Sequence, residues 1–163
     1  MPEPRPVAVD PDIDLHVPRQ RRELRRAPWV TLSAISAGGV AGSLARYGLS
    51  EAFGRGPGGF AWATFSINVS GCLLIGALMV AITEVWRAHP LTRPFLGVGV
   101  LGGYTTFSTY IVDFQRALQS GSPRTALAYL AATLFCALAA VHTGVHLTRL
   151  LTRRFRRSPE DPS

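Results

Sequence analysis

Four apolar stretches, each close to the length that a helix needs to cross a membrane, govern what this chain can fold into. They cover residues 29–50, 62–83, 95–112 and 125–147, and the third can be extended to residue 118. A helix needs roughly 20 apolar residues to span the hydrocarbon core of a bilayer. The short connections between the stretches make these helices antiparallel neighbours. The sequence therefore predicts an all-α integral membrane protein with four transmembrane helices.

The two ends of the chain differ from this apolar centre. Residues 1–28 mix proline, arginine and acidic residues without an apolar run. This composition predicts a disordered, Arg-rich cytoplasmic tail and no cleavable signal sequence. We predict one four-span domain over residues 29–150, followed by a basic C-terminal tail over residues 151–163.

Charge is concentrated where these spans end. The chain has 17 basic residues, all of them arginine, against 10 acidic residues. Twelve arginines flank the spans on the side that holds both termini and three flank them on the other side, which predicts cytoplasmic termini. Without a soluble domain to display this charge, nucleic-acid binding is not expected. The tryptophans also fall at span ends, where their rings prefer the headgroup region: Trp29, Trp62 and Trp86.

Small residues in the spans favour close helix packing. Gly38 and Gly42, and likewise Gly99 and Gly103, repeat at the four-residue spacing that lets helix backbones approach each other. Packing within one chain explains any single pair. Polar residues in the spans nevertheless need partners that one small unit does not obviously supply. We therefore expect a dimer or a larger assembly.

Two single polar residues inside the spans are candidates for ion binding. Arg46, near the end of the first span, carries a charge that costs about 2.5–3.5 kcal/mol at the centre of a membrane helix. Its side chain must therefore reach the interface or face protein and water. Asn68, in the second span, has a carboxamide that must be hydrogen-bonded when buried and whose two N–H donors suit an anion. Contact between helices is the competing interpretation of Asn68.

The third span contains the most informative run, residues 99–110, where paired glycines precede four hydroxyl residues and three aromatic residues. Such a run makes a poor continuous helix and predicts a break. Unwound backbone at membrane depth lines a cavity, and its carbonyls are ligands for a hard cation such as Na⁺. Hydroxyl groups and the positive edges of aromatic rings can face an anion. The run therefore predicts an ion-binding span.

On these motifs the chain resembles the Fluc/CrcB family of bacterial fluoride channels. The resemblance rests on Gly-Gly-x-x-Gly-x-x-x-Arg-Tyr at residues 38–47, on Asn68, and on Gly-Gly-Tyr-Thr-Thr-Phe-Ser-Thr-Tyr at residues 102–110, and it covers roughly residues 30–147. It implies an ion channel in the bacterial inner (plasma) membrane that exports toxic fluoride passively. It also implies a dimer of antiparallel subunits, a broken third helix and a structural Na⁺ at the dimer interface.

The resemblance further implies roles for single residues. The backbone carbonyls of Gly102 and Thr105 would bind the Na⁺. Asn68 would line the pore, and Phe107 would present its ring edge to fluoride. The other residues implied near the pore are Arg46, Ser108, Thr109, Tyr110, Tyr129 and Thr133.

Three features depart from what the resemblance leads us to expect. Tyr110 stands where the motif normally has Phe, and its hydroxyl is expected to bind water near the second fluoride position. Asp113 stands where Glu is common, and we expect it to pair with an arginine. The arginine bias is unexpected in a subunit that inserts in both orientations, because such a bias fixes orientation. We therefore hypothesise a heterodimer with an oppositely oriented paralogous chain, with a homodimer as the alternative.

Other functions fit the sequence less well. A proton-coupled small multidrug-type exporter is the alternative, but it needs a deep carboxylate, and Glu51 lies at the edge of the first span. An enzyme is not expected, because no nucleophile, base and acid can be placed at one depth. His142 and His146 share a helix face and could share a metal, but two ligands are too few, so we expect a hydrogen-bonded or interfacial pair instead. Cys72 and Cys136 lie in apolar runs, which indicates packed thiols rather than a disulfide framework.

Overall fold

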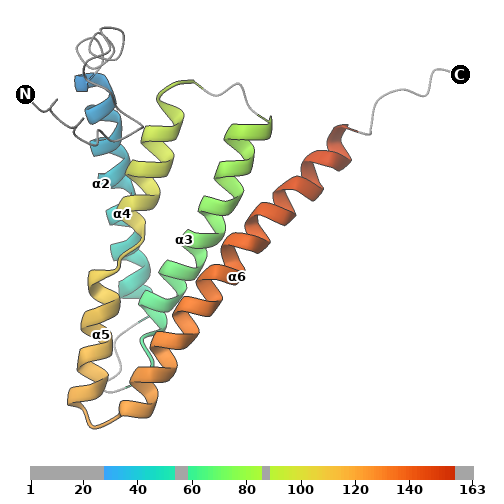
Figure 1. Ribbon diagram of the computed structural model, residues 1–163. Coiled ribbons are helices and arrows are strands. Elements are labelled where there is room, and N and C mark those ends of the chain that lie inside the picture. Colours follow the sequence, from blue (N-terminus) through green and yellow to red (C-terminus); the bar gives the residue numbers. More distant parts are fainter. Residues whose placement is uncertain (1–27, 54–58, 86–88, 157–163) are drawn as a thin grey trace, which may run out of the picture.

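The structure is a computed structural model that describes residues 28–53, 59–85 and 89–156. The part of the chain that it describes is built from helices, without a strand (Figure 1). The predicted N-terminal tail up to residue 27, Trp86 and residues 157–163 lie outside the described residues. The all-helical prediction is confirmed for the rest.

Each predicted span corresponds to a helix or a series of helices. The first and last are single helices, whereas the second continues into a π-helical turn, and the third is divided into three segments. The helices are α2 (Pro28–Ala52), α3 (Trp62–Val80), η1 (Ala81–Val85), η2 (Arg93–Leu101), α4 (Gly102–Tyr104), α5 (Ser108–Gln119) and α6 (Pro123–Arg156).

Three of these segments are long and apolar enough to cross a membrane: Trp62–Val85, Arg93–Gln119 and Pro123–Arg153. The chain is therefore a membrane protein by the length and hydropathy of its helices. Helix α2 is 25 residues long but is not among the three. Its many Gly and Ser residues and Arg46 make it less apolar than the others. A fourth membrane crossing by α2 therefore stays a prediction.

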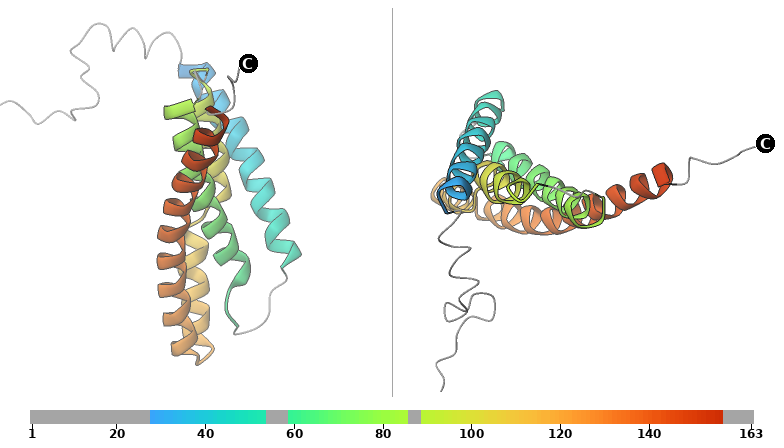
Figure 2. Two further views of the ribbon diagram at one scale, coloured as in Figure 1. Left: turned by 90° about the vertical axis from the view of Figure 1, so that its right-hand side faces the viewer. Right: turned by 90° about the horizontal axis from the view of Figure 1, so that it is seen from above.

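The helices run alternately up and down and associate mainly in pairs. Helix α2 lies along η2 and α4, and α3 lies along α6, while α5 contacts the first half of α6 (Figures 1 and 2). The N-terminal end of α2 and the C-terminal end of α6 lie at the same end of the bundle. Helix α6 runs to Arg156, nine residues beyond the predicted end of the fourth apolar stretch.

The predicted glycine pairs lie in the contact between α2 and the third span. A Cβ atom on Gly38 would overlap the backbone of Phe95, and one on Gly42 would overlap the carbonyl of Val100. A Cβ on Gly99 would lie 2.7 Å from the carbonyl oxygen of Ile35. These glycines are thus used for packing inside one chain, which is the simpler of the two roles that their spacing allows.

Large apolar side chains cover much of the outer surface of the described residues. Phe107 is 75% exposed and Phe135 is 68% exposed, whereas Ile67 and Tyr129 are fully buried. So much exposed apolar surface is unfavourable in water. It fits a protein whose helices are surrounded by lipid or by another chain.

Candidate ion-binding site

The helix of the third span is interrupted between α4 and α5. Helix α4 ends at Tyr104, Thr105 has extended backbone (φ −77°, ψ 159°), and α5 begins at Ser108. A continuous α-helix would pair each N–H with the carbonyl four residues earlier. Paired glycines, which have little preference for a helix, precede this interruption.

Two N–H groups at the interruption are diverted from their helical acceptors. The N–H of Thr106 donates to Asn68 Oδ1 at 2.9 Å, not to the Gly102 carbonyl. The N–H of Thr109 donates to Thr106 Oγ1 at 3.2 Å, not to the Thr105 carbonyl. The carbonyls of Gly102 and Thr105 are therefore two of the acceptors at the interruption whose helical donors bond elsewhere, and that of Thr105 also accepts from Arg46 Nη1.

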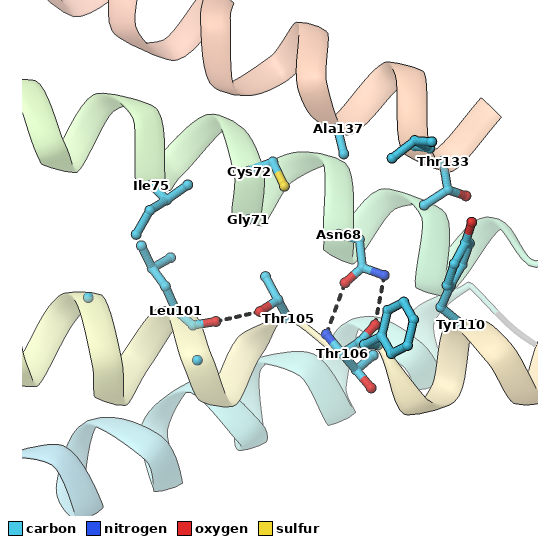
Figure 3. Close-up of a pocket in the computed structure, with 14 residues that line it drawn as sticks. Asn68, Gly71, Cys72, Ile75, Leu101, Thr105, Thr106, Tyr110, Thr133 and Ala137 are labelled. Carbon is cyan, nitrogen blue, oxygen red and sulfur yellow. Dashed lines mark hydrogen bonds between the residues drawn. The ribbon is translucent and has the colours of Figure 1, made fainter. Parts of the chain in front are cut away.

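Asn68 holds the interrupted segment against α3. Its Nδ2 donates to the Thr106 carbonyl oxygen at 2.9 Å, while its Oδ1 accepts from the Thr106 N–H at the same distance (Figure 3). The carboxamide thus replaces part of the missing helical pattern. Because Nδ2 carries two hydrogens, this clamp uses one donor and a second remains on the same atom. The two interpretations of Asn68, helix contact and ion contact, are therefore compatible.

A cavity of about 600 Å³ lies beside this clamp. It brings together Asn68 from α3, Gly102 and Thr105 from the third span, and Thr133 from α6. Figure 3 shows the Asn68 carboxamide between the Thr106 backbone and the α6 side of the cavity. Predicted residues that do not line the cavity are Arg46, Ser108, Thr109 and Tyr129; those that do are Asn68, Gly102, Thr105, Phe107, Tyr110 and Thr133.

Arg46 approaches the interruption from the opposite helix. Its Nη1 donates to the Thr105 carbonyl oxygen at 3.5 Å, and the side chain is half-buried. On the same helix, Ser43 Oγ donates to the Gly103 carbonyl oxygen, also at 3.5 Å. Both contacts are long for hydrogen bonds. Of the two options that the sequence left for Arg46, the structure favours a guanidinium that faces protein.

Hydroxyl groups cluster at the start of α5. Thr106 Oγ1 donates to Thr109 Oγ1 at 3.0 Å and lies 3.4 Å from Ser108 Oγ. Ser108 and Thr109 are exposed, whereas Thr106 is buried. A row of hydroxyls therefore leads from the buried clamp to the outer surface of α5, although sequence reasoning did not include Thr106.

Aromatic rings lie next to these hydroxyls. The rings of Phe107 and Tyr110 have centroids 5.8 Å apart, and that of Tyr110 lies 5.3 Å from the ring of Tyr129. The Tyr110 hydroxyl donates to the Leu130 carbonyl oxygen at 2.8 Å. The hydroxyl thus attaches α5 to α6, and the expectation that it binds water stays a prediction, since its oxygen can still accept a hydrogen bond.

A second polar contact joins α3 to α5, and sequence reasoning missed its first member. Thr64 Oγ1 donates to Asp113 Oδ2 at 2.6 Å, and Arg116 lies 3.3 Å from the other carboxylate oxygen. The predicted pairing of Asp113 with an arginine is confirmed. The sequence could have indicated Thr64, because it lies four residues before Asn68 and therefore on the same face of α3.

The Tyr129 hydroxyl lies close to this second contact. It is buried and has no hydrogen-bond partner among the residues that the structure describes, and Asp113 and Thr64 are among the polar groups that interact with it electrostatically. The Tyr129 backbone carbonyl accepts a hydrogen bond from Thr133 Oγ1 at 2.8 Å, as their four-residue spacing allows. A buried hydroxyl without a hydrogen-bond partner lowers the stability of the fold. Such a group in a native protein therefore calls for an explanation.

Side chains that usually bind metals do not converge in the described part of the chain. No group of three or more His, Cys, Asp and Glu side chains there could hold a metal ion. Both cysteines are free; Cys72 lines the cavity, and Cys136 is exposed. A cation in this region would therefore depend on backbone carbonyls and hydroxyls.

Comparison with known proteins gives a consistent result. The model of a family described as "CrcB-like protein, Camphor Resistance (CrcB)" matches residues 33–145. A protein named "Fluoride-specific ion channel FluC 2" from Streptomyces avermitilis is 50% identical over 132 residues, which are 80% of this chain and 84% of that protein.

Two further relatives carry similar names. A "Fluoride-specific ion channel FluC 2" from Nocardia farcinica is 51% identical over 126 residues, which are 77% of this chain and 90% of that protein. A "Fluoride-specific ion channel FluC 3", again from Streptomyces avermitilis, is 41% identical over 137 residues, which are 83% of this chain and 66% of that protein.

Proposed function

Because this chain belongs to the CrcB family, we propose that it is a fluoride-specific ion channel that lets fluoride leave the cytoplasm passively and so lowers its toxicity. The names of its relatives support fluoride as the permeating ion. The observation that carries the proposal is the Asn68–Thr106 clamp, which keeps polar groups beside a cavity within an apolar bundle.

Fluoride would cross by exchanging part of its water for donors of the chain. Asn68 has a second N–H donor beside the cavity, which Thr133 also lines, although the Thr133 hydroxyl donates to the Tyr129 carbonyl. Phe107 and Tyr110 would present ring edges, which carry partial positive charge, while the hydroxyls of Ser108 and Thr109 extend the path along α5. A narrow path with closely spaced donors would exclude larger halides.

A structural Na⁺ fits the backbone at the interruption. The Gly102 and Thr105 carbonyls are two acceptors at the interruption whose helical donors are diverted, and hard cations prefer oxygen ligands. At Gly102, the position of a Cβ atom has no neighbour within 4 Å, so the space beside the Cα atom is open. We propose that these two carbonyls hold Na⁺, which would neutralise their partial charge and keep the segment unwound.

Two antiparallel subunits would complete the channel. The exposed ring of Phe107 and the exposed Gly102 lie on a surface that lipid alone would cover poorly, because polar groups lie beside them. We propose a paralogous chain as the second subunit, because the arginine bias fixes the orientation of this one. Streptomyces avermitilis likewise has two relatives, whose names carry the numbers 2 and 3. Both termini would lie on the cytoplasmic side of the bacterial plasma membrane.

The alternative, a proton-coupled exporter, is less consistent with the acidic residues. Asp113 is held by Thr64 and Arg116, and Glu51 is exposed at the end of α2. A proton carrier needs a deep carboxylate that can release and rebind its proton. We therefore propose a passive pore, not a coupled transporter and not an enzyme.

Fluoride efflux from liposomes tests the proposal. We expect protein reconstituted alone, or with its paralogue where one is needed, to release fluoride electrogenically and to retain chloride. Phe107→Ile should lower the flux about tenfold or more, since one ring edge near the path is lost while this exposed side chain contributes little to folding. The control is Phe135→Ile, which changes a comparably exposed ring on α6. The absence of fluoride efflux from liposomes that contain correctly assembled protein would refute the proposal.

A further inference from the structure

Two histidines on α6 form a close pair away from the candidate site. His142 and His146 are both exposed, and their Nε2 atoms are 2.9 Å apart. Their ring centroids are 4.3 Å apart and the ring planes meet at 64°. Neither side chain lines the cavity beside Asn68. In this pair one imidazole donates and the other accepts a single hydrogen bond.

The distance between the two nitrogens suits a transition metal. Imidazole nitrogens bind such metals at about 2.1 Å. Two bonds of this length at a right angle put the nitrogens about 3.0 Å apart, whereas a tetrahedral angle requires about 3.4 Å. The observed 2.9 Å corresponds to neighbouring positions of a square-planar or octahedral ion. Ni²⁺ and Cu²⁺ favour these geometries.

We propose that His142 and His146 form a bidentate site for Ni²⁺ or Cu²⁺ on the exposed face of α6. For both Nε2 atoms to bind the ion, the imidazole that donates the hydrogen bond would carry its proton on Nδ1 instead, so that both rings stay neutral, and water would fill the other coordination positions. Two protein ligands make an open site, in contrast to a closed structural metal centre. This agrees with the absence, among the described residues, of a third His, Cys, Asp or Glu close enough to join a metal group.

His146 lies near the end of the fourth predicted span, residues 125–147, and His142 lies about one turn deeper in it. His146 precedes Arg149 by three residues, or about 4.5 Å along the helix axis. Arg149 binds Glu84 through Nη2 at 2.7 Å and through Nε at 2.9 Å, and both partners are exposed. An exposed ion pair at the end of a span lies at the interface of the membrane with water. The charge of Arg149 is thus offset by a carboxylate, which lessens its repulsion of a bound cation.

Isothermal titration of the purified full chain with NiCl₂ tests the site, with Mg²⁺ as the negative control. The protein must carry no histidine tag. We expect one Ni²⁺ per chain. His142→Gln and His146→Gln should each lower the affinity about a hundredfold, because a two-point contact becomes a one-point contact. His89→Gln, which removes an exposed histidine outside α6, should leave the affinity unchanged.

A matched variant separates spacing from histidine content. In the double variant Thr143→His, His146→Gln, two histidines remain on α6, but neighbouring residues on a helix do not face each other. Its affinity should match that of His146→Gln alone. The proposal is overturned if this variant binds Ni²⁺ as tightly as the native chain. It is also overturned if the native chain binds no Ni²⁺ or binds one ion per two chains. None of these results depends on fluoride flux.

Discussion

The third span is held on two sides by contacts of different kinds. On one side, glycines bring the backbone of α2 against η2 and α4; we call this the glycine contact, and it includes Gly38, Gly42, Gly99 and Gly103. On the other side, polar side chains of α3 reach the interruption and α5; we call this the polar contact, and it includes Asn68, Thr106, Thr64 and Asp113.

The glycine contact positions the third span, whereas the polar contact supplies its hydrogen-bonding groups. Backbones that touch through glycine leave no room for water or an ion, so the glycine contact can only fix where the third span lies. The polar contact meets the hydrogen-bonding needs of an unwound segment with side chains, and it borders the cavity. A membrane protein can therefore keep irregular backbone inside the bilayer when close packing fixes one side of the segment and polar side chains on the other side pair with its backbone groups.

The largest effect is expected in the glycine contact. Gly42→Ala adds a methyl group that overlaps the Val100 carbonyl and comes within 2.8 Å of the Tyr104 nitrogen. Because backbone cannot move aside as a side chain can, we expect a loss of about 3 kcal/mol or failure to assemble. Thermal unfolding in detergent micelles measures the change. Gly48→Ala on the same helix has open space around it and should be neutral; equal effects of both changes would argue against the backbone contact.

Breaking the clamp of the polar contact should have the next largest effect. Asn68→Ala leaves the Thr106 N–H and carbonyl without their partner, which costs about 2 kcal/mol. It also removes a donor beside the cavity, so fluoride flux should fall further than the loss of folded protein explains. Flux per amount of folded protein in liposomes measures this. Cys72→Ala, a change at another cavity-lining position of α3, is the control.

An unchanged flux per amount of folded protein in Asn68→Ala would show that the carboxamide serves structure alone. The cavity would then be a packing feature, and the ion path would have to follow another face of the bundle. Asn68→Asp sharpens the distinction because it keeps an acceptor for the Thr106 N–H but removes the donor and adds negative charge. We expect Asn68→Asp to conduct less than Asn68→Ala, since a carboxylate repels fluoride.

The second part of the polar contact should respond more weakly. Thr64→Val keeps the shape of the side chain but removes the donor to Asp113, a charged acceptor at 2.6 Å. We expect a loss of about 1.5 kcal/mol, the usual range for a hydrogen bond to a charge. Asp113 retains Arg116 as a partner, which limits the effect. The denaturation midpoint of Thr64→Val is to be compared with that of the surface variant Thr143→Val. Similar midpoints would mean that the Thr64 hydroxyl does not stabilise the fold.

The two contacts also differ in how far sequence predicts them. The apolar lengths identify the helices, and the glycine spacing identifies the positions of close approach, because both follow from local geometry. The sequence also identifies Asn68 and residues 99–110 as unusual. It does not reveal that Asn68 binds the backbone of Thr106, since that pairing depends on how α3 and the third span are aligned. Spacing alone likewise leaves open whether a glycine pair serves one chain or two.

Other differences have similar causes. Helix α6 continues to Arg156 because arginine favours a helix, so a charged sequence beyond an apolar stretch does not end it. The Tyr110 hydroxyl appears in the sequence as a polar group near the predicted path, but its acceptor is a carbonyl on another helix. Contacts between a side chain and distant backbone have no sequence pattern. Testing them requires variants.

Tyr110→Phe should have the smallest effect. It tests the hydrogen bond that joins α5 to α6, which is outside both the glycine contact and the polar contact. The change removes only the hydroxyl that donates to the Leu130 carbonyl, and such bonds in membrane proteins average about 0.6 kcal/mol. The ring remains 5.8 Å from that of Phe107, so the aromatic edge is kept. We expect a slightly lower midpoint in thermal unfolding and a fluoride flux within about twofold of the native value. A flux that changes tenfold while stability is unaltered would show that this hydroxyl contacts the ion. In that case the path would pass between α5 and α6, and the polar contact of α3 would form only one of its walls.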